Sequence, residues 1–337
     1  MNETTIITHF SEPNWQIVNK LSAISKCLDV KLLHCSSFEK LKKTVKQPFT
    51  GKVLFFTDEG MIDFVAELDA SSFRSRFEAA MFIFSPISAM AHKISNLRIV
   101  KYLIGVQSVE SYGRDLAILI KKFSQDDILN LEKYLAFGCK VNERVVSSGK
   151  SKRDALEAIN NYILRLGDPG YLHPFREYAR VVSELTDELL LNAIFNANPK
   201  MHGVDRSQPF NLHSREEVRV EWGYDGEYFG VSVRDPFGKF SSNTIMSYLA
   251  TQKRMGELLV SPSAGLGLKF IFERAHQVIA NVKQEQVTEV MVLVKFVNRM
   301  RDFEQEKKSF YYFGDESSKS GNKNEEKNEN KATYAKG

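Results

Sequence analysis

Short apolar runs alternate with stretches of helical periodicity over the first 125 residues of the chain. The apolar runs predict strands at residues 5–10, 30–34, 52–57, 81–84 and 102–106. Helical patterns separate these runs, at residues 14–28, 60–68 and 112–123 among others. The alternation predicts an α/β domain at residues 1–125, in which a doubly wound parallel sheet carries helices on both faces.

The pattern changes after residue 125. A connecting helix is predicted at residues 126–136, because Ile128, Leu131 and Leu135 share one side of it. A second α/β domain is predicted at residues 137–300. Its expected elements are a strand at 139–146, helices at 152–166 and 181–198, a hairpin at 218–235, and strands at 278–282 and 290–296. Residues 301–337 are predicted to be a polar, largely disordered tail, since the Lys-, Asn- and Glu-rich end cannot bury enough apolar surface to order itself.

The helix predicted at residues 181–198 carries the first candidate chemistry. Val181, Leu185 and Leu189 form an apolar stripe, and Glu188 and Asn192 lie one turn apart on another face. A carboxylate and a carboxamide at this spacing can jointly hold a divalent cation and a water molecule. The same spacing is also typical of a solvated polar face, so the helix alone does not decide between the two.

Two further signals follow in the chain. Asp235 ends the apolar face of the hairpin, where a carboxylate is costly unless it finds a hydrogen-bond donor; a turn cap or a solvent-facing side chain is the alternative. Residues 265–268 (GLGL) lead directly into a helix. Glycines allow the backbone to approach an anion, and a helix N-terminus offers free N–H groups. A Gly-x-Gly pair by itself is more often only a turn.

Composition narrows the function classes. The chain has 337 residues, a net charge of +4 and 43% hydrophobic residues, as in a soluble globular protein of two domains. Lysines of the polar tail contribute to the charge, so it does not predict a nucleic-acid surface. The three cysteines are widely spaced, and no uninterrupted apolar run approaches membrane-spanning length. With no signal-peptide pattern at the N-terminus, these features predict a cytoplasmic protein that binds neither nucleic acid nor membrane.

Taken in order, the three signals resemble the boxes of the GHKL ATP-binding family, which includes histidine kinases, type II topoisomerases and anti-sigma serine kinases. Residues 188–193 (ELLLNA) match the N box, residues 235–238 (DPFG) the first glycine box, and residues 265–268 the second. The resemblance covers about residues 137–300. It implies an α/β sandwich of the Bergerat ATP-binding type with ATP and Mg²⁺ as cofactors.

The resemblance also implies roles for single residues. Asn192 would coordinate Mg²⁺, and Glu188 would orient or deprotonate an attacking group as the catalytic residue. Asp235 would accept a hydrogen bond from the adenine amino group, and residues 241–263 would form a lid in which Lys253 and Arg254 are candidate phosphate partners. The cofactor-binding residues implied are Asn192, Asp235, Gly238, Lys253, Gly265, Leu266, Gly267 and Leu268.

Two departures from the family pattern are visible. Phe237 stands where the first glycine of the usual Asp-x-Gly-x-Gly box belongs, and Gly238 follows it. No helix with a phosphoacceptor histidine precedes the N box. A strand and a helix before the N box without such a helix are similar to the arrangement of the anti-sigma serine kinases.

The N-terminal domain resembles the receiver domains of two-component signalling, which have a flavodoxin-like fold. Asp58 follows the third strand, where a receiver carries its phosphoacceptor, and Ser85 follows the fourth. Residues 9–12 (HFSE) lack the acidic pair that binds Mg²⁺ in receivers, and residues 105–107 (GVQ) lack their lysine. The resemblance therefore implies a pseudo-receiver that binds a partner without being phosphorylated.

Together these features predict a cytoplasmic ATP-binding signalling regulator that acts on a partner protein. The resemblance implies a sigma factor, an antagonist or a phosphotransfer protein as the partner, phosphorylation of serine or threonine as the activity, and a homodimer as the assembly. Two alternatives stay open. One is a nucleotide-gated interaction protein without chemistry, and the other is an incomplete histidine kinase that acts in trans.

Overall fold

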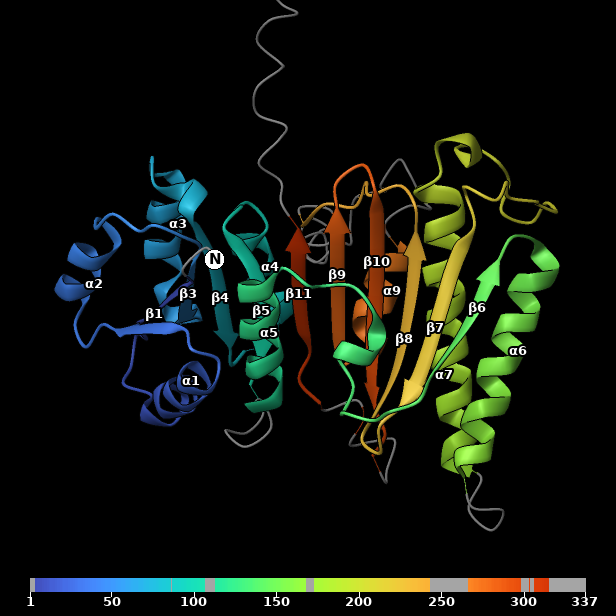
Figure 1. Ribbon diagram of the computed structural model, residues 1–337, viewed down its shortest axis with the longest axis horizontal. Coiled ribbons are helices and arrows are strands. Elements are labelled where there is room, and N and C mark those ends of the chain that lie inside the picture. Colours follow the sequence, from blue (N-terminus) through green and yellow to red (C-terminus); the bar gives the residue numbers. More distant parts are fainter. Residues whose placement is uncertain are drawn as a thin grey trace, which may run out of the picture.

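In the described part of the chain, one mixed β-sheet of eleven strands carries helices on both faces (Figure 1). The computed structural model describes residues 4–85, 87–106, 113–167, 173–242, 266–297, 303 and 306–314. The strand order across the sheet is β2-β1-β3-β4-β5-β11-β9-β10-β8-β7-β6. The predicted α/β class is thereby confirmed. Within the described residues, no helix is both long and apolar enough to cross a bilayer.

The N-terminal part of the sheet is parallel, as the alternation of strands and helices predicted. Its strands are β1 (Thr5–Thr8), β2 (Lys31–His34), β3 (Val53–Asp58), β4 (Phe77–Ile83) and β5 (Val100–Gly105). Its helices are α1 (Trp15–Cys27), α2 (Phe38–Val45), α3 (Ile62–Ala70), α4 (Ile87–Ile94) and α5 (Gly113–Gln125). Every residue of β3 is buried, because the sheet is covered on both sides at this central strand. The side chains of Asn14 and Ser37 cap α1 and α2 and so fix where these helices begin.

The C-terminal part of the sheet is antiparallel, apart from the pairing of β9 with β11. Its strands are β6 (Val141–Val146), β7 (Val218–Tyr224), β8 (Tyr228–Asp235), β9 (Gln277–Lys283), β10 (Val287–Lys295) and β11 (Ser309–Gly314). Its helices are α6 (Gly149–Leu166), α7 (His173–Leu191) and α9 (Leu266–Arg274), which pack on one face of the sheet (Figure 1). Short 3-10 turns lie at Glu59–Met61, Arg74–Arg76, Leu131–Lys133 and Pro199–Met201. The hairpin predicted at residues 218–235 is confirmed as β7 and β8, with Gly226 at positive φ in its turn.

Strand β11 corrects the prediction of a disordered tail from residue 301. Residues 309–314 (SFYYFG) pair with β9 in parallel and with β5 in antiparallel orientation, and so join the two parts of the sheet. Phe310 and Tyr312 point into the core on one face, and Tyr311 and Phe313 into the core on the other. The composition of the residues beyond 315 concealed this short aromatic run, which buries enough surface to order a strand.

Residues 126–136 do not form the connecting helix that the sequence predicted, and only one short 3-10 turn forms there. The backbone N–H of Asn130 donates to the carboxylate of Glu289 on β10 at 3.1 Å. The next N–H, that of Leu131, donates to the carboxylate of Glu221 on β7, also at 3.1 Å. Because these two donors bond to the sheet rather than to a preceding helical turn, the segment lies flat on the face opposite α6 and α7.

Buried charges on this opposite face hold the same segment in place. Glu289 is fully buried and accepts hydrogen bonds from Arg234 Nε at 3.1 Å and from Asn281 Nδ2 at 2.9 Å. Arg234 also donates to Asn130 Oδ1 at 2.7 Å. The carboxylate and the guanidinium therefore satisfy one another in a place where either alone would be costly.

We predict that Arg234→Met lowers the free energy of unfolding by about 3 kcal/mol, because Glu289 loses its buried cation. Arg219 is the matched control: it lies opposite Arg234 in the β7–β8 register but makes an exposed ion pair with Glu143. Arg219→Met should change the free energy of unfolding by no more than about 0.5 kcal/mol. Urea denaturation of both variants measures the difference, and equal effects would contradict the role of the buried pair.

Candidate functional site

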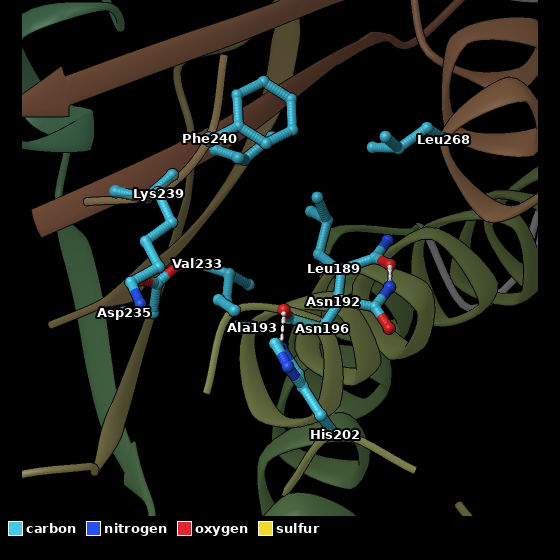
Figure 2. A pocket seen from close by; sticks show the side chains of 13 residues that line it. Leu189, Asn192, Ala193, Asn196, His202, Val233, Asp235, Lys239, Phe240 and Leu268 are labelled. Atoms are coloured by element: carbon cyan, nitrogen blue, oxygen red, sulfur yellow. Dashed lines mark hydrogen bonds between the residues drawn. The ribbon is translucent and has the colours of Figure 1, made fainter. Parts of the chain in front are cut away.

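A cavity of about 370 Å³ opens between α7, α9 and the C-terminal strands (Figure 2). This size is within the range of small-molecule sites. Its lining residues are Leu189, Asn192, Ala193, Asn196, Ala197, His202, Val233, Asp235, Lys239, Phe240, Leu268, Thr288 and Val290. The walls are mainly aliphatic, with one aromatic ring, and polar groups gather at two places. One cluster of polar groups lies at the end of α7, and the other lies at the end of β8.

Helix α7 ends in a π-helical turn (Asn192–Asn196) that shapes the first polar place. The N–H of Ala197 donates to the carbonyl of Asn192 at 2.9 Å, which closes the wider turn. Such turns are rare and occur often at functional sites. Here the turn brings the carboxamides of Asn192 and Asn196 to the cavity wall (Figure 2). Asn198-Pro199 then prevents the helix from continuing.

A chain of polar side chains begins at Glu188 and runs along the end of α7. Asn192 Nδ2 donates to Glu188 Oε1 at 3.2 Å, and Asn196 Nδ2 donates to Asn192 Oδ1 at 2.5 Å. Arg206 Nη2 donates to Asn196 Oδ1 at 3.0 Å and adds a cation to the chain. Burial raises the pKa of Glu188, while the charge of Arg206 and the hydrogen bond from Asn192 act to lower it. The spacing of Glu188 and Asn192 therefore places them in contact, as predicted, and the chain extends to two residues that the sequence did not single out.

The first turn of α9 packs directly against Glu188. A Cβ atom on Gly267 would lie 1.7 Å from Glu188 Oε1, so a larger residue here would displace the Glu188 carboxylate. Leu268 lines the cavity, and Leu266 is the first residue of α9. Gly265, Lys253 and Arg254, which the sequence also indicated, lie outside the described residues.

Asp235 and Thr288 form the second polar place, at the opposite end of the cavity. The two residues are register partners on β8 and β10, and both are buried. Burial raises the pKa of Asp235 to about 7, although the backbone N–H groups of Phe237 and Gly238 donate to its carboxylate. The hydroxyl of Thr288 is buried and has no hydrogen-bond partner among the described residues. Among the described residues, Asp235 makes no ion pair, and a buried carboxyl of this kind and an unpartnered hydroxyl are both costly unless a ligand supplies the missing hydrogen bonds.

Gly238, which the sequence indicated for the cofactor site, is not among the residues that line the cavity. Its φ is +61°, and a Cβ atom there would lie 2.3 Å from the carbonyl oxygen of Lys283 in the β9–β10 turn. The glycine therefore lets the chain turn closely over that hairpin. Lys239 and Phe240, which follow it, reach the cavity in its place (Figure 2).

The sequence also missed Asn196, His202 and Thr288 as cavity residues. Thr288 carries a signal that strand register could have revealed: a hydroxyl in an apolar strand, directly opposite Asp235. Asn196 lies one turn after Asn192 and continues the polar stripe of α7. No signal in the sequence places His202, which comes from the loop after the helix and bonds to the backbone oxygen of Asn196.

The cavity therefore offers apolar walls between two clusters of polar groups, Asp235 with Thr288 at one end and Asn192 with Asn196 at the other. Among the described residues, no group of three or more His, Cys, Asp or Glu side chains could hold a metal ion. A hard cation at Asn192 would thus need further oxygen ligands from the bound molecule. Mg²⁺ commonly binds in this manner, with few protein ligands plus phosphate and water.

A separate candidate site lies around Asp58, at the carboxyl ends of the parallel strands. Its carboxylate accepts hydrogen bonds from Ser11 N at 2.9 Å, Ser11 Oγ at 3.0 Å and Gly60 N at 3.1 Å. Ser85 Oγ donates to Glu59 at 2.7 Å. These contacts make Asp58 a capping residue whose oxygens are occupied by the protein itself.

We predict that Asp235→Asn stabilises the protein at pH 8. The pKa of Asp235 is raised in the folded state, so the stability linked to its protonated form is present below about pH 4 and is lost as the pH rises through about 7. Holding the carboxylate ionised costs on the order of 4 kcal/mol, and asparagine removes that cost. Thermal melting across this pH range should show a higher Tm for the variant at pH 8 and a difference that shrinks toward pH 4. A variant that melts below the wild type at pH 8 would contradict the burial argument.

We predict that acetyl phosphate and beryllofluoride produce no response that depends on Asp58, since Ser11 and Gly60 already occupy its carboxylate. The melting temperatures of wild type and Asp58→Asn should respond equally to both reagents. A shift that occurs in the wild type and is absent in the variant would show that Asp58 is a phosphoacceptor.

No family model and no curated protein matches the chain.

Proposed function

We propose that the cavity binds an adenine nucleotide together with Mg²⁺, and that the protein uses this binding to regulate a partner protein. The observation that carries the proposal is the pair of Asp235 and Thr288. A buried carboxyl and a buried unpartnered hydroxyl lie side by side at one end of an apolar cavity. The amino group and ring nitrogen of an adenine base would supply a donor and an acceptor to this pair.

The other end of the cavity would receive the phosphates. Asn192 would offer its carboxamide oxygen to Mg²⁺, whose role when bound is to neutralise phosphate charge. The first turn of α9 would add backbone N–H groups and the positive end of the helix dipole. Glu188 would stand next to this place and orient or deprotonate an attacking hydroxyl, since it lies in contact with both Asn192 and Gly267.

The fold supports the same family proposal. The parallel strands follow the order β2-β1-β3-β4-β5, which is the flavodoxin-like order of receiver domains. In the C-terminal part, α6, α7 and α9 cover one face of an antiparallel sheet, and the segments similar to the GHKL boxes meet at the cavity between them. We propose a pseudo-receiver joined to a Bergerat-type ATP-binding domain. Transfer of phosphate to a serine or threonine of a sigma factor or its antagonist would be the corresponding activity.

A second candidate function is nucleotide-gated binding of the partner without phosphoryl transfer. The contacts of Glu188 favour this function, because the protein itself engages the carboxylate. The carboxylate receives a hydrogen bond from Asn192 and packs on Gly267, and burial raises its pKa. In this arrangement the nucleotide would act by ordering the residues around the cavity.

We predict that Asn192→Ala weakens the binding of ATP with Mg²⁺ at least about tenfold, since a metal ligand is lost. The loss should be smaller when Mg²⁺ is left out. Asn161, which is exposed on α6, provides the matched control, and Asn161→Ala should bind like the wild type. Isothermal titration calorimetry measures all three proteins with and without Mg²⁺. A wild-type protein that binds no ATP would contradict the proposed function.

We predict that Glu188→Gln leaves ATP affinity within about threefold of the wild type, because the side chain keeps its shape and its contacts. If the protein transfers phosphate, the same variant should lose at least about a hundredfold in rate, since the carboxylate is gone. Glu184→Gln is the control one turn away, where Arg180 and Arg274 bind the side chain at the surface. Transfer of radiolabelled phosphate to partner proteins distinguishes the two candidate functions, and unchanged transfer by Glu188→Gln would remove the role assigned to Glu188.

A further inference from the structure

The segment Phe240–Ser242 leaves the cavity near the end proposed to hold the adenine base, and it contacts strands β5 and β11. The ring of Phe240 lines the cavity, across from Asn192 and Asn196 on α7 (Figure 2). Two residues later, Ser242 is buried. The position of Phe240 in the cavity wall therefore depends on what holds the backbone of this short segment.

The side chains of Tyr312 and Lys101 bind the segment Phe240–Ser242, and neither of them lines the cavity. Tyr312 on β11 donates its hydroxyl to the carbonyl of Phe240 at 3.3 Å. Lys101 on β5 donates its ammonium to Ser242 Oγ, also at 3.3 Å. The same ammonium lies 4.8 Å from the centre of the Tyr312 ring, in the geometry of a cation–π contact.

The burial of Lys101 makes this arrangement specific. Only 7% of the residue is exposed, and a buried ammonium is costly unless hydrogen bonds and a π face replace its water. Ser242 and Tyr312 provide both. Displacement of the segment would remove one hydrogen-bond partner of a buried charge, so the contact fixes the segment more firmly than an exposed lysine would.

We propose that Lys101 and Tyr312 are positioning residues that hold Phe240 against the base of the bound nucleotide. Lys101 lies on the last strand of the parallel part, and Tyr312 on the strand that joins the two parts of the sheet. The parallel part thus contacts the segment that carries Phe240 into the cavity wall. An aromatic ring in that wall can stack on a purine, and stacking of this kind contributes substantially to binding. This inference rests on the proposed function.

The test uses the full-length protein and compares ATP with adenosine. Tyr312→Phe keeps the ring under Lys101 and removes the hydrogen bond to Phe240, so we expect ATP to bind about fivefold more weakly. Adenosine should lose the same factor, because it shares the base and lacks the phosphates. Lys101→Met should weaken both ligands at least as much. Calorimetry gives the affinities, and thermal melting of the ligand-free variants shows that the fold is retained.

Tyr311→Phe is the matched control. Tyr311 lies next to Tyr312 on β11 but points into the opposite face, where its ring packs against that of Tyr102. This variant should bind ATP and adenosine like the wild type.

Three outcomes would overturn the inference, and they are distinguishable. A wild type that binds neither ligand contradicts the proposed function and the inference with it. If the wild type binds ATP and the Tyr312→Phe variant binds ATP and adenosine as tightly as the wild type does, only the inference is contradicted. A variant that loses affinity for ATP and not for adenosine places the effect at the phosphates, and this also contradicts a role in holding the base.

Discussion

The pairing of β11 with both β5 and β9 is the interaction on which the rest of the structure depends. It turns a parallel sheet and an antiparallel sheet into one continuous layer. The strand brings aromatic side chains to both faces, so each core is closed by residues from the far end of the chain. A sheet edge left open at β5 or β9 would expose backbone hydrogen-bonding groups and apolar surface. The same strand carries Tyr312, which bonds to the backbone of Phe240 in the cavity wall and so links the sheet to the geometry of the site.

Adjacent residues of β8 and β10 show how the two faces of the sheet differ. Glu289 is the register partner of Arg234, and on their face the protein satisfies its own charges and ties down residues 126–136. One position along, Thr288 is the register partner of Asp235. On this cavity face the Thr288 hydroxyl has no hydrogen-bond partner in the described part of the chain, and burial raises the pKa of Asp235. Polar groups that a protein buries and does not satisfy are costly in stability. Asp235 and Thr288 both line the cavity, and this shared position is the physical argument for a ligand there.

Local patterns predicted much of the fold, because they depend on neighbours in sequence. The parallel strands, the hairpin with its Asp-Gly turn and the polar stripe of α7 all follow from side-chain periodicity. The helix predicted at 126–136 was wrong, because the apolar spacing of its residues could not reveal that buried carboxylates from β7 and β10 would bind its N–H groups. Strand β11 and Thr288 needed tertiary information, namely which strands are neighbours and in what register. In the site, spacing predicted the contact of Glu188 with Asn192, whereas the place of Gly238 depended on the packing of a distant turn.

The central claim is that Asp235 and Thr288 recognise the base of an adenine nucleotide. The most direct measurement compares the affinities of ATP and purine riboside 5′-triphosphate, which differ only in the amino group, for the wild-type protein at pH 8. A site built around a buried acceptor should bind ATP about a hundredfold more tightly, since the analogue lacks the amino group that would donate to the carboxylate of Asp235. Equal affinities for the two nucleotides would contradict the account.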